Sequence, residues 1–270
     1  MINILMSGNN NVKDGLLIVV LSYIKHNSEP VTIYFETMDF RDLNPKYLPI
    51  TENNVRYIES LLKKANPESS IRIIDCSELF KSTMPERLDL DNIYTPYSLL
   101  RILADKLDIP DKILYLDTDI MILSKIDDLF SFDVSDTEFA AVIDYLGKTW
   151  ISSQYQNSGV MLMNIRKIRE TGFLEKCRKY ISKNKSPFLD QDALNRFVTA
   201  KVYLPNKFNE QHKRREDTVI RHFSKTIKWF PFFHTQNIKP WMVSQVHSVM
   251  KTNQYDDILN EYLELKNNLD

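Results

Sequence analysis

Two aspartates, Asp117 and Asp119, stand two residues apart at the end of an apolar run over residues 113–116. The run is typical of a strand, and alternate side chains of a strand point to one face, so both carboxylates share that face. Carboxylates held this close repel each other unless a positive charge lies between them. Divalent cations such as Mg²⁺ and Mn²⁺ prefer oxygen ligands. The pair therefore predicts a metal-bridged phosphate site at the rim of a sheet, where open α/β folds bind ligands.

The pattern also has a plainer structural interpretation. Asp-x-Asp often arises by chance, and many strands end in a polar turn. Three features favour metal binding here: the apolar run before the pair, Ile120 and Met121 directly after it, and polar motifs further along the chain.

The composition excludes several function classes. The 270 residues are 43% hydrophobic and 26% charged, which is ordinary for a globular protein of one large domain or two small ones. Because the formal net charge is −1, no nucleic acid partner is expected. Cys76 and Cys177 lack a metal-binding spacing and indicate free thiols in a reducing compartment.

The scarcity of glycine limits the possible phosphate sites. None of the five glycines has the spacing of a dinucleotide-binding fingerprint, and no Walker motif is present. These absences argue against NAD enzymes and P-loop NTPases. A bound phosphate would therefore be held by metal and side chains.

No targeting or membrane segment is apparent. Residues 15–24 are too few to span a bilayer, and residues 260–270 are polar, without the basic and aromatic cluster of an anchor. We expect a cytoplasmic protein with no transmembrane segment and at most peripheral membrane contact.

Alternating strands and helices must position the aspartates. Strands are expected at residues 2–6, 31–36, 71–75 and 112–117. Helices are expected between them, ending near His26, over 51–66 with Thr51 as N-cap, and over 95–107. This order predicts a parallel sheet with right-handed crossovers.

The second half of the chain is expected to complete the sheet. Strands are expected at 139–144, 159–164, 202–204 and 219–223, and helices at 173–183, 190–197 and 255–265. We interpret the chain as an α/β domain over residues 1–245 with a small helical C-terminal extension over 246–270.

Five further motifs accompany the aspartate pair, in a fixed order. They are Ser7-Gly8-Asn9-Asn10-Asn11, Tyr97 to Arg101, Asn157 to Asn164, Leu189 to Asn195, and Arg221-His222-Phe223 followed by Lys228-Trp229. Each motif alone is weak, but their ordered combination over residues 2–241 resembles glycosyltransferase family 8, the retaining nucleotide-sugar transferases.

This resemblance implies a fold, an activity and a donor. The fold would be the Rossmann-like GT-A glycosyltransferase fold, a mostly parallel mixed sheet flanked by helices. The activity would be metal-dependent, retaining transfer of glucose or galactose from a UDP-sugar to a glycan, glycolipid or glycoprotein acceptor. Asp117 and Asp119 would be its DXD motif, holding Mn²⁺ or Mg²⁺ as a Lewis acid on the leaving diphosphate.

The resemblance also implies a third metal ligand and a diphosphate-binding lysine. His222 and Lys228 match these positions, six residues apart. A competing match is His234 with Lys239-Pro240-Trp241. We favour His222 and Lys228, and leave Lys239 and Trp241 as a lid or structural anchor.

Donor-binding positions follow from the same resemblance. Arg101 would face the sugar or diphosphate, whereas the alternative is a solvated helix arginine. Residues matching the nucleotide side are Ser7, Gly8, Asn9, Asn11 and Thr118. The family usually carries an acidic residue where this chain has Asn9, so the preference for uridine is open while UDP is the expected nucleotide.

Asp190 and Gln191 are the candidate catalytic residues. Asp190 would bind donor hydroxyls, alone or while capping its helix, and Gln191 would lie on the far face of the anomeric carbon. Because an amide is a poor nucleophile, front-face displacement is more economical, with a covalent intermediate on Asp190 as the alternative. Asp144 and Asn157 match positions near the transferred sugar or acceptor, although Asn157 could also be a turn residue.

Two other functions compete. Haloacid-dehalogenase-type phosphatases also place Asp-x-Asp after a strand with Mg²⁺, but they usually carry Thr or Val where Met121 stands here. A non-catalytic family member could bind sugar nucleotides without turnover, although the set of matching residues argues against such a loss.

Overall fold

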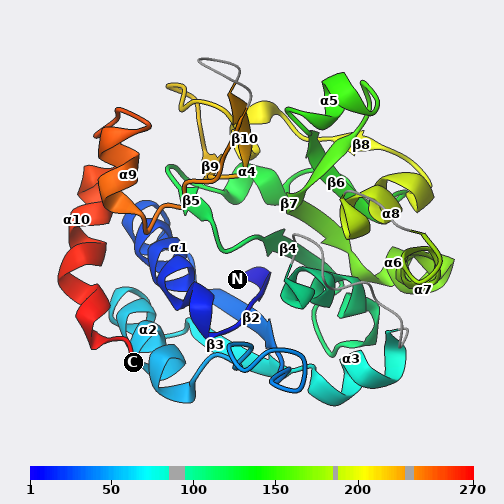
Figure 1. Cartoon of the computed structure of the whole chain (residues 1–270), viewed down its shortest axis with the longest axis horizontal. Coiled ribbons are helices and arrows are strands. Elements are labelled where there is room, and N and C mark those ends of the chain that lie inside the picture. The colour runs from blue at the N-terminus through cyan, green and yellow to red at the C-terminus, as the bar shows by residue number, and fades with distance from the viewer. Residues whose placement is uncertain (85–94, 185–187, 229–233) are drawn as a thin grey trace.

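The computed structural model describes residues 1–84, 95–184, 188–228 and 234–270 (Figure 1). Its strands are β1 (Ile2–Ser7), β2 (Val31–Thr37), β3 (Ser70–Asp75), β4 (Lys112–Leu116), β5 (Ile120–Ile122), β6 (Phe139–Ile143), β7 (Gln156–Asn164), β8 (Val202–Tyr203), β9 (Ile220–His222), β10 (Thr226–Lys228) and β11 (His234–Gln236). Its α-helices are α1 (Lys13–His26), α2 (Glu52–Ala65), α3 (Ser77–Thr83), α4 (Asp127–Phe130), α5 (Gly147–Trp150), α6 (Ile165–Thr171), α7 (Phe173–Ile181), α8 (Leu189–Phe197), α9 (Val243–Ser248) and α10 (Asp256–Leu265). Four 3-10 helices are η1 (Asn10–Val12), η2 (Pro96–Lys106), η3 (Asn206–Phe208) and η4 (Lys266–Asn268).

A seven-stranded sheet in the order β3-β2-β1-β4-β7-β6-β8 forms the centre of the molecule. The pairs among β1 to β4 are parallel, β7 is antiparallel to both β4 and β6, and β8 is parallel to β6. The predicted mostly parallel mixed sheet flanked by helices is therefore confirmed.

Side-chain alternation along the strands builds two hydrophobic cores, one on each face of the sheet. In β4, Leu114 and Leu116 join a core with α1, α2 and α10, whereas Ile113 and Tyr115 join a core with η2, α7 and α8. Figure 1 shows these helices on opposite sides of the sheet. Both faces are thus covered, as a parallel sheet requires.

Local helix signals were partly predictable. Thr51 caps α2 as expected, since its hydroxyl accepts a hydrogen bond from the Asn54 amide at 3.3 Å. The segment expected as a helix over 95–107 is instead a 3-10 helix. Two backbone carbonyls of this segment accept hydrogen bonds from arginine side chains. Arg101 donates to the Ser98 carbonyl, and Arg178 donates to the Ile102 carbonyl.

A two-stranded ribbon lies beyond the end of β4. In this ribbon β5 pairs with β9 in antiparallel fashion, and Ile120 lies opposite His222. The turn of Asp117 and Asp119 joins β4 to β5, so the ribbon brings a histidine from a hundred residues away to the aspartates.

The C-terminal helix α10 packs on α1. Lys25 pairs with Asp257 at 3.0 Å, and Tyr262 donates a hydrogen bond to Asp14 at 2.7 Å. The division of the chain at residue 245 stays a prediction. Within the described residues, no helix combines the length and the apolar character needed to cross a membrane.

Candidate active site

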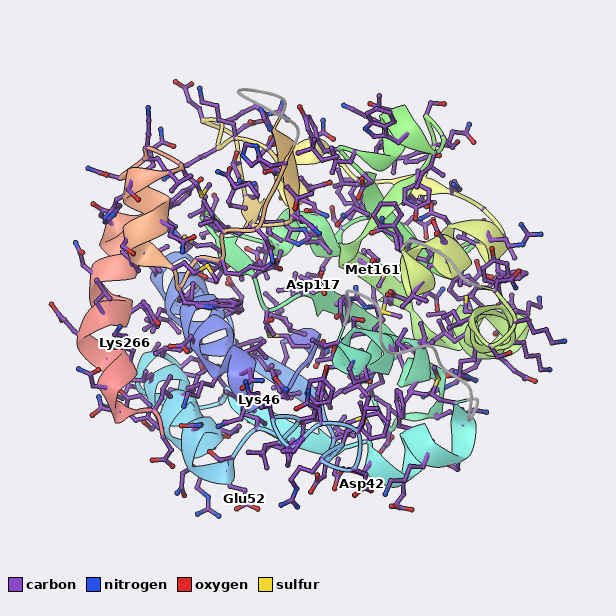
Figure 2. All side chains as sticks on the ribbon, viewed as in Figure 1. Asp42, Lys46, Glu52, Asp117, Met161 and Lys266 are labelled. Atoms are coloured by element: carbon purple, nitrogen blue, oxygen red, sulfur yellow. The ribbon has the colours of Figure 1, made fainter. Side chains whose placement is uncertain are left out.

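A cavity of about 470 Å³ opens at the carboxyl ends of β1 and β4. Asp117 lies near the middle of the view in Figure 2, away from the labelled surface residues Glu52 and Lys266. The structure brings almost all of the predicted site residues to this one cavity. They are Ser7, Gly8, Asn9, Asn11, Arg101, Asp117, Thr118, Asp119, Asp144, Asn157, Asp190, Gln191 and His222.

Asp117, Asp119 and His222 form a group that fits a metal ion. One ligand atom from each residue lies within 4.8 Å of the others. His222 Nε2 is 3.1 Å from Asp119 Oδ1 and 3.7 Å from Asp117 Oδ2. The two carboxylates suit Mn²⁺ or Mg²⁺, and the imidazole nitrogen favours the transition metal Mn²⁺ of the two.

Asn209 fixes the orientation of the His222 ring, and the sequence motifs did not identify it. Its side-chain oxygen lies 3.1 Å from His222 Nδ1. If Nδ1 carries the proton and donates to that oxygen, the lone pair of Nε2 faces the carboxylates, as a metal ligand requires. Asn209 also donates to Asn157 at 2.8 Å. Only the folded chain reveals this support, because Asn209 lies outside every motif that was recognised.

Lys239 is the lysine that the structure places against the aspartates. Its ammonium donates to Asp119 and, at 3.3 Å, to the Phe223 carbonyl. Burial would raise the pKa of Asp119, but Lys239 and His222 overcome this effect and hold that pKa well below its usual range. The side chain of Lys228 lies outside the described residues, so its diphosphate role stays a prediction. Trp241 lines the same cavity.

Arg101 connects two of the acidic residues. It is 6% exposed, and its guanidinium lies 3.0 Å from Asp117 Oδ1 and 3.1 Å from Asp190 Oδ2. Tyr115 supports this arrangement, since its ring stacks under Arg101 and its hydroxyl donates to Asp117 at 2.9 Å. Arg101 is therefore a buried site residue and not a solvated helix arginine.

Asp190 presents a buried carboxylate oxygen to the cavity. Burial raises its pKa to about 6, partly opposed by Arg101. Its Oδ2 is paired with Arg101 but accepts no well-aligned hydrogen bond from any described group. A substrate hydroxyl in the cavity would supply that hydrogen bond.

A hydrogen-bond network holds Gln191 in place. Its side-chain oxygen accepts from the Ser158 amide at 2.9 Å and from the Ser158 hydroxyl at 3.0 Å. Its amide nitrogen lies 3.3 Å from Asp144 Oδ2, which also accepts from Asn157 at 2.7 Å. Asn157 thus belongs to the site network.

The N-terminal turn forms the far wall of the cavity. Asn9 is buried and accepts a hydrogen bond from the Asn11 amide at 3.1 Å, which caps η1. The Ser7 hydroxyl lies 3.0 Å from the Tyr115 hydroxyl. An asparagine can therefore build this turn where the family usually has an acidic residue.

Comparison with known proteins identifies the family. The model of glycosyl transferase family 8 matches residues 3–244. A lipopolysaccharide 1,3-galactosyltransferase of Salmonella typhimurium is 26% identical over 238 residues, which cover 81% of this chain and 67% of that protein. Glycosyltransferase GlyA of Streptococcus pneumoniae serotype 4 is 29% identical over 161 residues, which are 60% of this chain but only 20% of GlyA.

A solved structure shares the fold. The galactosyltransferase LgtC, in complex with donor and acceptor sugar analogues, has a TM-score of 0.71 at 19% identity, covering 99% of this chain and 100% of that chain. The fold is accordingly of the GT-A type of that enzyme. Since the family model matches nearly the whole chain, the protein belongs to glycosyl transferase family 8.

Proposed function

We propose that this protein is a metal-dependent, retaining glycosyltransferase that moves glucose or galactose from a UDP-sugar to a glycan, glycolipid or glycoprotein acceptor in the cytoplasm. The observation that supports it best is the convergence of Asp117, Asp119 and His222 with Lys239 and Arg101 in one cavity. A nucleoside diphosphate needs both a cation and positive side chains around it. The name of the Salmonella relative supports a galactosyl donor, and that of a 24% identical lipopolysaccharide 1,2-glucosyltransferase of Escherichia coli supports a glucosyl donor.

The metal would be held by Asp117, Asp119 and His222. When bound, Mn²⁺ or Mg²⁺ supplies Lewis-acid stabilisation of the charge that develops on the leaving diphosphate. Lys239 lies beside Asp119 and would contact the same diphosphate. Glycine-rich phosphate loops are absent from the sequence, so these side chains would carry the phosphate binding.

Asp190 and Arg101 would orient the transferred sugar. With a pKa of about 6, Asp190 is largely ionised at neutral pH and can accept hydrogen bonds from donor hydroxyls. Gln191 is a weaker candidate for a nucleophile, because Ser158 already occupies its side-chain oxygen with two hydrogen bonds. We therefore favour front-face displacement, in which the acceptor hydroxyl gives its proton to the leaving diphosphate. Gln191 and Asp144 would position the sugar.

The test is a donor assay with Mn²⁺ and either UDP-glucose or UDP-galactose, alongside a phosphomonoester. We expect release of UDP and, by proton NMR, a sugar product whose first-formed anomer is α. An inverted anomer would contradict the retaining mechanism. Phosphate release from the monoester without donor consumption would favour a phosphatase, and UDP binding without turnover under any acceptor would favour a non-catalytic protein.

A further inference from the structure

A second cavity of about 420 Å³ adjoins the candidate active site. Ser224 and Thr226 line both cavities, so the two share a wall. The rest of the second wall comes from the segment around Arg214, the strand β9 and the turn between α9 and α10.

The second cavity is strongly basic. Its described lining includes Lys213, Arg214, Arg221 and Lys251 but no aspartate or glutamate, although the whole chain has a formal net charge of −1. Within the described residues, neither Lys213 nor Lys251 forms an ion pair, and both are exposed to solvent. Four cations without an acid repel one another, so the lining favours an anion between them.

Arg221 makes this cavity more than a charged surface. It is 2% exposed, and its guanidinium donates to the carbonyls of Glu210 at 2.5 Å, His222 at 2.6 Å and His212 at 3.1 Å. Its Nε has no hydrogen-bond partner among the described groups, and no described carboxylate pairs with it. A buried charge that is not neutralised is costly, and an anion in the cavity would offset that cost.

The strand β9 links this charge to the active site. Arg221 and His222 are consecutive, so their side chains point to opposite sides of the strand. His222 faces the aspartates, and Arg221 lines the second cavity. A group bound beside Arg221 would therefore lie on the opposite side of β9 from the candidate metal centre.

We propose that the second cavity binds a phosphate group carried by the acceptor, which places the acceptor hydroxyl toward the donor across the shared Ser224 and Thr226 wall. Guanidinium and ammonium groups are the side chains that recognise phosphate. This inference rests on the proposed transferase function and specifies its acceptor as an anionic, phosphate-bearing glycan or glycolipid.

The test compares binding of inorganic phosphate to the wild type, the double variant Lys213→Gln/Lys251→Gln and a control, Lys64→Gln, on the exposed face of α2. Calorimetry should show phosphate binding to the wild type and control, weakened by about tenfold in the double variant. The exposed positions leave the fold intact, which circular dichroism checks. Absence of binding to the wild type, equal binding to the double variant, or displacement by UDP overturns the proposal.

Sedimentation with phosphatidylglycerol and phosphatidylcholine vesicles distinguishes the source of the phosphate. Retention by the anionic vesicles that depends on Lys213 and Lys251 indicates a lipid-borne phosphate, whereas inorganic phosphate binding without vesicle retention indicates a glycan-borne one. UDP-galactose hydrolysis, measured in parallel, should be the same in the wild type and the double variant. Absence of hydrolysis by the wild type overturns the proposed function, whereas absence of phosphate binding to a wild type that does hydrolyse UDP-galactose overturns the acceptor site alone.

Discussion

At the scale of single residues, the structure adds most to the interpretation at Lys239. The motifs left two histidine and lysine pairs open, and Lys228 was favoured over Lys239. The ammonium of Lys239 contacts Asp119, and its side chain lines the candidate active-site cavity. We infer that Lys239 contacts the diphosphate, and the role of Lys228 stays a prediction.

Substituting Lys239 should therefore weaken donor binding. We expect Lys239→Gln to raise the Kd for UDP in the presence of Mn²⁺ by about tenfold to a hundredfold, because a charge-assisted contact to phosphate is lost. Lys64→Gln, on the exposed face of α2, is the control and should leave the Kd near that of the wild type. A larger effect of Lys228→Gln, measured by calorimetry, would restore the original assignment.

Residues on recognisable motifs were predictable, and residues that support them were not. Asp117 and Asp119 follow an apolar strand, so their shared direction could be inferred from the sequence. Asn209 touches His222 only because β9 folds back beside η3, and no local pattern signals that contact. Ser158 belongs to the motif from Asn157 to Asn164, but its two hydrogen bonds to Gln191 depend on the packing of α8 against β7.

At the scale of elements, the feature that shapes the site most is the close packing of β7 against the candidate metal centre. Gly159 lies on β7, where an added Cβ would meet His222 Cε1 at 2.2 Å and Asp117 Oδ2 at 2.8 Å. These distances leave no room for a side chain, so the glycine allows both candidate metal ligands to approach the strand.

Gly159→Ala should consequently displace His222 and Asp117. We expect Mn²⁺ affinity to fall by about tenfold or more, with a loss of unfolding free energy of about 1–3 kcal/mol from overpacking. Gly172→Ala is the control, since an added Cβ there meets nothing within 4 Å. Its φ of +62° costs roughly 1 kcal/mol in stability, and Mn²⁺ binding should not change. Unaltered Mn²⁺ binding by Gly159→Ala, measured by electron paramagnetic resonance, would contradict the described packing.

Long elements were easier to predict than short ones. The strands β1 to β4 and helices α1 and α2 carry enough residues to display a period, and their positions agree with the expectation. The strands β5, β10 and β11 have three residues each, too few for alternation to be visible. The three-residue strand β9 agrees with the strand expected at 219–223, but its pairing with β5, which brings His222 to the aspartates, could be found only from the folded chain.

A buried glutamate affects the stability of the whole molecule. Glu36 is 0% exposed on β2, and neither of its carboxylate oxygens has a hydrogen-bond partner among the described groups. Burial raises its pKa to about 8, although Arg101 partly opposes this rise. The folded protein therefore keeps a proton on Glu36 at neutral pH, which the unfolded chain releases.

This proton makes stability fall as the pH rises. Between about pH 5 and pH 8 the Glu36 contribution lowers the free energy of unfolding by roughly 1.4 kcal/mol per pH unit. Glu36→Gln should remove that slope, whereas Glu52→Gln, at an exposed position on α2 (Figure 2), should keep it. Urea denaturation at three pH values measures both slopes. An unchanged slope in Glu36→Gln would show that Glu36 is ionised in the folded protein.

The central claim is that Asp117, Asp119 and His222 hold a divalent metal that binds the donor diphosphate. Calorimetric titration of UDP with and without Mn²⁺ tests this claim most directly. The wild type should bind UDP about tenfold or more tightly with Mn²⁺, and Asp119→Asn should lose this dependence while keeping its circular dichroism spectrum. Equal UDP affinity of the wild type without Mn²⁺, or a full Mn²⁺ effect in Asp119→Asn, would contradict the claim.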